Sequence, residues 1–186
     1  MIHSEIELED ETIVTLVCSG STDHFKLLIK RHERAVKGFG FSFFHNVQDS
    51  GDFAQEVFIK VFNSLRQFKG DSKFTTWLYR IAYTTAVNKI NRRKEYVSLA
   101  DKEIESAYHT PEDLHIRSSI CEAVRKAVAG LEEKYRVCID LFFFYDCTYE
   151  EIETITGFPV NTVKSHVFRA KKILKEKLSK LVEEGY

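Results

Sequence analysis

The chain has 186 residues, 44% of them hydrophobic and 30% charged, and its formal net charge is −1 at pH 7. A chain of this length and composition can bury a core as one domain or two small ones. Its acidic start lacks the order of a signal peptide, and no apolar run reaches the roughly 18 residues of a membrane span. The four cysteines lack zinc-ligand spacing. We therefore expect a cytoplasmic protein with reduced thiols and without membrane insertion, a structural metal or a cofactor.

Apolar residues recur along the chain at three- and four-residue spacings, and glycine and proline are scarce, which predicts an all-α fold. The periodic segments are residues 11–44, 51–65, 75–93 and 118–181. Between the last two, residues 95–117 are polar and acidic and contain Pro111, which is typical of a linker. We predict two small helical domains, residues 1–94 and 118–186, joined by this flexible linker.

The second periodic segment carries a polar stripe opposite its apolar face. Asp49 or Ser50 is the expected N-cap. The predicted buried face consists of Phe53, Val57, Val61, Phe62 and Leu65. The opposite stripe consists of Asp52, Gln55, Glu56, Ile59 and Asn63. Carboxylates, amides and an isoleucine in one stripe fit a protein-docking face, and a solvated face is the alternative.

Two blocks of the chain are strongly basic although the total charge is near zero. Residues 66–94 hold eight Lys/Arg against one acid, and residues 159–180 hold seven against one. Two separate basic helical blocks favour a polyanion bound at two places, whereas solvated charged faces are the alternative.

The stretch FKGDSK, residues 68–73, begins the first basic block. Gly70 gives this loop backbone freedom, so it can form a pocket for one unstacked base while Lys69 and Lys73 hold the neighbouring phosphates. Asp71 and Ser72 are its short hydrogen-bonding side chains. In the alternative reading, Ser72 only caps the helix that follows and Asp71 complements its dipole. The spacing of the next residues favours a core position for Trp77, Leu78 and Ile81, and DNA contact stays open for Trp77.

The second basic block follows a helix-turn-helix pattern. Thr148 and Glu151 have capping-box spacing, Gly157 supplies a helix end, and Pro159 precedes the next helix. The apolar stripe of that next helix is Val163, Val167, Ala170, Leu174 and Leu178. Its other face holds Asn161, Lys164, Ser165, Phe168, Arg169 and Lys172. These side chains suit phosphates and base edges, which predicts a DNA-reading helix; a plain amphipathic hairpin is the alternative.

Two long segments of the sequence resemble a known family. DSGDFAQEVFIKVFNSLRQFKGDSKFTTWLYRIAYTTAVNKINRRK resembles the second conserved region of extracytoplasmic-function (ECF) sigma factors, and LEEKYRVCIDLFFFYDCTYEEIETITGFPVNTVKSHVFRAKKIL resembles the fourth. With the linker, the resemblance covers about residues 22–180. It implies a non-catalytic bacterial subunit that binds core RNA polymerase, brings it to promoters and is regulated by a separate anti-sigma factor. The acidic linker would thread toward the active-site channel of the polymerase.

The resemblance also implies roles for individual residues. The implied contacts with core polymerase are Asp52, Gln55, Glu56 and Ile59. The implied contacts with the minus-ten element are Lys69, Asp71, Ser72, Lys73, Arg80, Tyr83, Thr84, Asn88 and Arg92. The implied contacts with the minus-thirty-five element are Asn161, Thr162, Lys164, Ser165, His166, Phe168, Arg169 and Lys172. Thr84 stands where many members carry Asn, and His166 stands where a basic residue is common. The promoter sequence is therefore the property that the resemblance predicts least well.

Two other classes of protein compete with this reading. A stand-alone helix-turn-helix regulator would explain the second domain only. A helical enzyme is disfavoured because the seven histidines lack ligand spacing and the chain has no glycine-rich phosphate loop.

Overall fold

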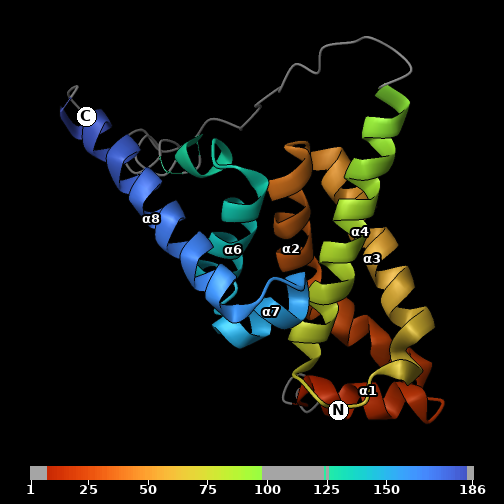
Figure 1. Cartoon of the computed structure of the whole chain (residues 1–186). Coiled ribbons are helices and arrows are strands. Elements are labelled where there is room, and N and C mark those ends of the chain that lie inside the picture. Colours follow the sequence, from red (N-terminus) through yellow and green to blue (C-terminus); the bar gives the residue numbers. More distant parts are fainter. Residues whose placement is uncertain (1–7, 98–123, 125, 184–186) are drawn as a thin grey trace. The chain divides into compact units, whose positions relative to one another are not determined.

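The structure is a computed structural model, and it describes residues 8–97, 124 and 126–183. The chain divides into two compact units, Met1–Ser106 and Ala107–Tyr186 (Figure 1). Every regular element among the described residues is a helix, which confirms the all-α prediction. None of the described helices combines the length and apolar character needed to cross a membrane.

Four α-helices lie in the described part of the first unit. They are α1 (Asp10–Cys18), α2 (Phe25–Phe44), α3 (Val47–Ser64) and α4 (Phe74–Val97). Short 3₁₀ turns at Thr22–His24 and Leu65–Gln67 precede α2 and follow α3. Since α4 continues to Val97, the first residues of the predicted linker are helical, and most of that linker lies outside the described residues.

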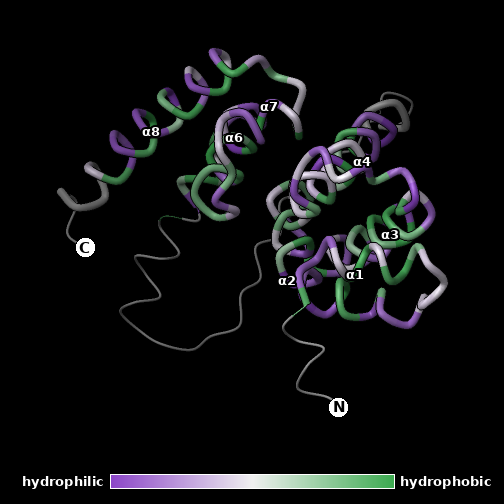
Figure 2. Tube along the Cα trace, turned by 90° about the horizontal axis from the view of Figure 1, so that it is seen from below, coloured by the Kyte–Doolittle hydropathy of each residue, from purple (hydrophilic) through white to green (hydrophobic). Residues whose placement is uncertain are grey.

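An aromatic core joins α2, α3 and α4. Phe39, Phe53 and Phe74, one from each helix, are completely buried. A Cβ atom on Gly40 of α2 would lie 2.4 Å from the Phe53 ring, so the missing side chain allows α2 and α3 to approach closely. Each labelled helix in Figure 2 carries both hydrophobic and hydrophilic residues, as expected for amphipathic helices around a core.

Two helix boundaries in this unit differ from the prediction. The predicted segment 11–44 is broken after Cys18, where Gly20 has a φ of 112°. The predicted cap of α3 was wrong, because α3 begins at Val47 and the Asn46 side chain accepts a hydrogen bond from the Asp49 amide at 3.0 Å. Ser50 is buried instead, and its hydroxyl donates to the Asn46 carbonyl.

The second unit has the predicted helix-turn-helix. Residues 126–129 are helical, followed by α6 (Glu133–Phe143), α7 (Tyr149–Thr156) and α8 (Val160–Glu183). Thr148 and Glu151 form the capping box at the start of α7, and Gly157 ends that helix with a φ of 77°. In the apolar stripe of α8, Val163, Val167 and Ala170 are buried.

Candidate functional surfaces

The polar stripe of α3 lies on the surface of the first unit. Asp52 and Gln55 are exposed, and Ile59 is 61% exposed, a large value for an apolar side chain. Glu56 is half-buried and forms an ion pair with Lys60 at 2.7 Å. The Lys60 ammonium group also donates to the Thr85 hydroxyl of α4 at 3.1 Å. The side chains of all four predicted polymerase contacts are therefore accessible, and Glu56 also pairs with a neighbouring cation.

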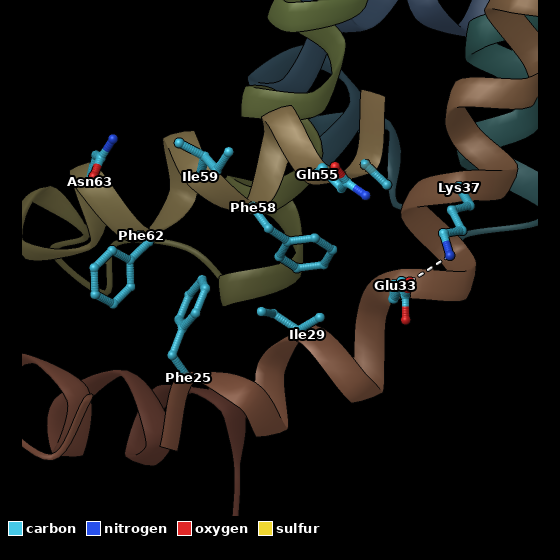
Figure 3. Close-up of a pocket in the computed structure, with 10 residues that line it drawn as sticks. Phe25, Ile29, Glu33, Lys37, Gln55, Phe58, Ile59, Phe62 and Asn63 are labelled. Atoms are coloured by element: carbon cyan, nitrogen blue, oxygen red, sulfur yellow. Dashed lines mark ion pairs between the residues drawn. The ribbon is translucent and has the colours of Figure 1, made fainter. Parts of the chain in front are cut away.

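A groove of about 410 Å³ borders this stripe, between α2 and α3 (Figure 3). Its lining from α2 is Phe25, Ile29, Glu33 and Lys37. Its lining from α3 is Ala54, Gln55, Phe58, Ile59, Phe62 and Asn63. Glu33 and Lys37 form an ion pair at one end. The groove thus joins two of the predicted contacts, Gln55 and Ile59, to an apolar floor.

Sequence reasoning did not find this groove, and the reason is Phe62. Phe62 was assigned to the buried face of α3, but it is 43% exposed and its ring packs against Phe25 with 5.0 Å between centroids. An apolar residue in the core and one lining an open groove follow the same helical spacing. The signal available in the sequence was Ile59 on the otherwise polar stripe.

The loop at residues 68–73 has the exposure and backbone freedom that the sequence predicted. Gly70 has a φ of 77°, which favours glycine, and open space surrounds it. The side chains of Lys69, Asp71 and Lys73 are exposed, and Ser72 is half-buried. A base entering this loop would therefore meet two ammonium groups and one carboxylate.

Three aromatic rings pack together where this loop meets α4. The Phe68 ring lies 5.9 Å from that of Phe74 and 5.4 Å from that of Trp77. Phe74 is completely buried, as is Leu78, while Trp77 is half-buried. Trp77 therefore packs against the loop with part of its ring accessible to solvent.

The start of α4 is capped from a distant part of the chain. The Phe74 amide donates to the Glu11 carboxylate of α1 at 2.9 Å. The Ser72 hydroxyl instead donates to the Lys73 carbonyl at 3.3 Å. The alternative in which Ser72 caps α4 is therefore wrong.

The outer face of α4 extends the loop surface. Arg80, Thr84 and Asn88 are exposed at four-residue spacings, and Arg92 is exposed one turn further. Tyr83 is half-buried, with its ring 6.4 Å from that of Phe43. The minus-ten residues predicted on α4 therefore form an exposed row with one ring anchored in the core.

The polar face of α8 is also exposed. Asn161, Lys164, Arg169 and Lys172 are exposed, and Phe168 is 68% exposed. Thr162 and Ser165 are half-buried. The Arg169 guanidinium donates to the Tyr135 hydroxyl at 3.4 Å, so this side chain has a structural contact as well as exposure.

His166 differs from its neighbours on α8. Its ring packs edge-on against the rings of Tyr135 and Phe158, each 5.3 Å away, and its Nδ1 lies 3.7 Å from the Cys138 sulfur. Burial, followed by the positive charges of Lys134 and Arg169, lowers the pKa of His166 below its ordinary value. The lowered pKa favours the neutral form of His166 at neutral pH, and its ring contributes to the packing between α6 and α8.

An aromatic patch beside α8 was also missed. Phe143 is 57% exposed, and the Lys171 ammonium group lies 4.9 Å from the ring centroids of both Phe142 and Phe143. The Phe142 ring stacks on Tyr149 at 5.1 Å. In the sequence these phenylalanines belong to the longest apolar run, whose length alone does not distinguish core from surface.

Models of two sequence families match the chain, one in each unit. Sigma-70 region 2 matches residues 28–96, and Sigma-70, region 4 matches residues 121–174. The RNA polymerase sigma-H factor of Pseudomonas aeruginosa is 34% identical, over 95% of this chain and 97% of that protein. The ECF RNA polymerase sigma-E factor of Escherichia coli K12 is 32% identical, over 95% of this chain and 97% of its own length.

Solved structures show the same fold. The sigma factor RpoE of Bartonella quintana, in complex with the anti-sigma factor NepR, is 25% identical with a TM-score of 0.73, covering 83% of this chain and 96% of that one. CnrH, in complex with the cytosolic domain of CnrY, is 21% identical with a TM-score of 0.65, covering 95% of this chain and 99% of that one.

Two helical units with exposed polar and basic faces define a regulatory DNA-recognition protein of the sigma-70 class. The chain belongs to the ECF sigma factors, which direct transcription initiation by RNA polymerase. The region 2 match removes the support for a stand-alone regulator, because such a protein would account for the second unit only.

Proposed function

We propose that α3 and its groove bind core RNA polymerase, that the loop at residues 68–73 and α4 bind the minus-ten element, and that α8 binds the minus-thirty-five element. The observation that carries this proposal is the separation of exposed groups. An acidic and apolar face lies on α3, and cation-rich faces lie on α4 and α8. Such a protein acts without catalysis of its own, in the cytoplasm where the polymerase works.

The α3 surface fits a helical protein partner. Ile59 and Phe62 offer exposed apolar area beside the groove, while Asp52 and Gln55 offer hydrogen-bonding groups at its edge. A central apolar anchor with a polar rim is the usual composition of a protein interface. The partner we propose is the pair of clamp helices of the largest polymerase subunit, as the family resemblance implies.

The minus-ten surface fits single-stranded DNA. Binding single strands in preference to a duplex requires cations for phosphates, rings for bases and a loop that accepts an extruded base. Lys69 and Lys73 supply the cations, and Gly70, with its positive φ, gives the backbone the freedom to accept a base. Arg80, Thr84, Asn88 and Arg92 continue the contact along α4.

The minus-thirty-five surface fits the major groove of a duplex. Exposed residues of α8, among them Asn161, Lys164 and Arg169, can donate to phosphates and base edges, and Phe168 can meet a thymine methyl. The half-buried His166 packs against two rings and so orients α8, while its contact with the minus-thirty-five element stays a prediction.

An anti-sigma factor is the expected regulator. The Bartonella quintana protein with this fold was solved bound to one. The same resemblance implies that the acidic linker enters the polymerase channel, and most of that segment lies outside the described residues.

Reconstitution tests the whole proposal. The protein is added to core polymerase, and run-off transcripts from genomic fragments are measured. Specific transcripts that need both components are expected. If no transcripts appear with core polymerase, or if the protein regulates through DNA without core, the proposal is contradicted. A stand-alone regulator would then be favoured.

Two variant sets separate the surfaces. Replacing Asp52 and Gln55 together with Ala should weaken core binding at unchanged helicity, since both side chains are exposed, whereas Arg34→Ala on the surface of α2 should not. Grafting a different sequence at residues 69–72, which spares the Phe68 ring, should change preference at one non-template minus-ten base. Unchanged core affinity, or a uniform loss at every promoter, would remove the respective assignment.

A further inference from the structure

The acidic helix α1 makes two contacts that converge on Phe74. The Glu11 carboxylate accepts the Phe74 amide at 2.9 Å, and the two residues are 63 positions apart. Figure 1 shows α1 at the end of the first unit where α4 begins. The first amides of a helix have no partner inside the helix, and a carboxylate placed there is favoured by the helix dipole. Glu11 thus supplies an N-terminal cap to α4 from a distant helix.

Asp10, the neighbour of Glu11, fastens α1 to α2. Its carboxylate accepts hydrogen bonds from Arg31 and from the His32 ring, the latter at 2.7 Å. Arg31 also donates to the Leu8 carbonyl at 2.9 Å. His32 is buried, and its ring lies 5.7 Å from that of Phe74. Asp10 therefore holds α1 in place, and His32 contacts the same residue that Glu11 caps.

Phe74 connects these contacts of α1 to the loop at residues 68–73. Its ring touches Phe68, where the loop begins, and its amide lies directly after Lys73, where the loop ends. One end of the loop therefore contacts the buried Phe74 side chain, and the other end is joined to the Phe74 backbone. Within the loop itself, Gly70 permits a wide range of conformations.

We infer that Glu11 is a positioning residue for minus-ten recognition, because it fixes the start of α4 and with it the conformation of the loop at residues 68–73. This inference rests on the proposed reading role of that loop. Glu11 touches no DNA in this scheme. It limits the conformations from which the loop must select when a base enters, which is how preorganisation increases selectivity.

The test compares Glu11→Ala, Glu11→Gln and Glu9→Ala in complete holoenzyme. The Gln side chain retains a carbonyl oxygen that can accept the Phe74 amide, while Ala cannot. Glu9→Ala is the matched control because it removes one exposed carboxylate from the same acidic segment. Run-off transcription from promoters varied at each minus-ten position measures base preference, and duplex binding measures the minus-thirty-five contact.

We expect Glu11→Ala to reduce discrimination at one minus-ten base by about fivefold, the factor that corresponds to a lost helix cap. Glu11→Gln should restore most of that discrimination, and Glu9→Ala should match the wild type. Core affinity and duplex binding should stay unchanged. Wild-type discrimination in Glu11→Ala, or an equal loss at all promoters, would overturn the inference.

Trp77 gives a second measurement that does not depend on transcription. It is the only tryptophan of the chain and packs 5.4 Å from Phe68 at the base of the loop. Glu11→Ala should shift its emission to longer wavelength and speed hydrogen exchange at the Phe74 amide, and Glu11→Gln should do neither. Unchanged emission and exchange in Glu11→Ala contradict the positioning role.

The graft at residues 69–72 separates the two proposals. If the graft changes base preference and Glu11→Ala does not, the loop reads DNA without help from α1 and the inference alone fails. If the graft leaves preference unchanged, the reading role of the loop fails, and the inference falls with it even where Trp77 responds to Glu11→Ala.

Discussion

The two candidate DNA surfaces differ in how far along the sequence the residues that stabilise them lie. The helix-turn-helix is fixed by neighbours in sequence, since Thr148 and Glu151 cap α7 and Gly157 ends it. The loop at residues 68–73 is fixed by Glu11, which is more than sixty positions away from its partner Phe74. A helix cap from a neighbouring residue can be recognised in the local sequence, whereas a contact between distant residues forms only when the chain folds. The first unit should therefore lose DNA recognition through distant substitutions, and the second mainly through local ones.

The largest expected effect tests the long-range packing of the first unit. Gly40→Ala places a Cβ atom 2.4 Å from the Phe53 ring, which must move. We expect the free energy of unfolding of the first unit to fall by about 2–3 kcal/mol. Gly51→Ala is the matched control, because no atom lies within 4 Å of a Cβ there, and it should stabilise α3 by about 0.5–1 kcal/mol. Hydrogen exchange of the full chain measures both; equal effects of the two variants contradict the close approach of α2 and α3.

The next effect concerns base reading by α8. Arg169→Ala should weaken binding to the cognate duplex by about 2 kcal/mol and relax specificity, whereas Lys172→Ala should weaken all duplexes alike. Tyr135→Phe is the control, because it removes the hydroxyl that accepts from Arg169 and leaves the guanidinium in place. Competition binding on specific and random duplexes is the measurement. Equal losses on both duplexes in Arg169→Ala would show that Arg169 holds phosphate only.

A smaller effect tests the local support of the second unit. Thr148→Ala removes the hydroxyl that accepts the Glu151 amide and should cost about 1 kcal/mol. Faster hydrogen exchange should be confined to α7 and the start of α8, while α4 stays unchanged. Thr148→Ser, which keeps the hydroxyl, is the control. Loosening that spreads into the first unit would argue against separate support for the two units.

The smallest expected effect concerns Asp10 and the dependence of stability on pH. Burial raises its pKa, but hydrogen bonds from His32 and Arg31 and their charges outweigh burial, so the pKa lies below the ordinary value of 3.8. The stabilisation from Asp10 is therefore complete above about pH 4 and is lost as the pH falls through the lowered pKa. The stability difference between wild type and Asp10→Asn, followed by acid titration of the first unit, should shrink below about pH 4. A constant difference down to about pH 2 contradicts the ion-pair role.

The same difference in range explains what the sequence could and could not predict. Thr148, Glu151 and Gly157 were assigned correctly because caps and glycine ends are local patterns. Asn46 was missed because Asp49 and Ser50, three and four residues later, are equally good cap types. Helical spacing also placed Phe62 in the core, since it cannot tell a core from a groove.

Long-range partners leave no local trace at all. Glu11 reads as one more acid in an acidic segment, and its role depends on how α1 lies against α4. The family resemblance placed His166 among the minus-thirty-five contacts, and in the structure its half-buried ring packs against Tyr135 and Phe158. For both residues the partners lie in other parts of the fold, which composition and periodicity do not reveal.

The Lys60 ammonium group joins the polar stripe of α3 to the buried side of α4. It pairs with Glu56 on that stripe and donates to the Thr85 hydroxyl, which is buried. A partner that binds the Glu56 carboxylate competes with Lys60 and so changes the hydrogen bonding of α4. A double-mutant cycle on Glu56 and Thr85 would measure the interaction energy that links the stripe to α4 through Lys60.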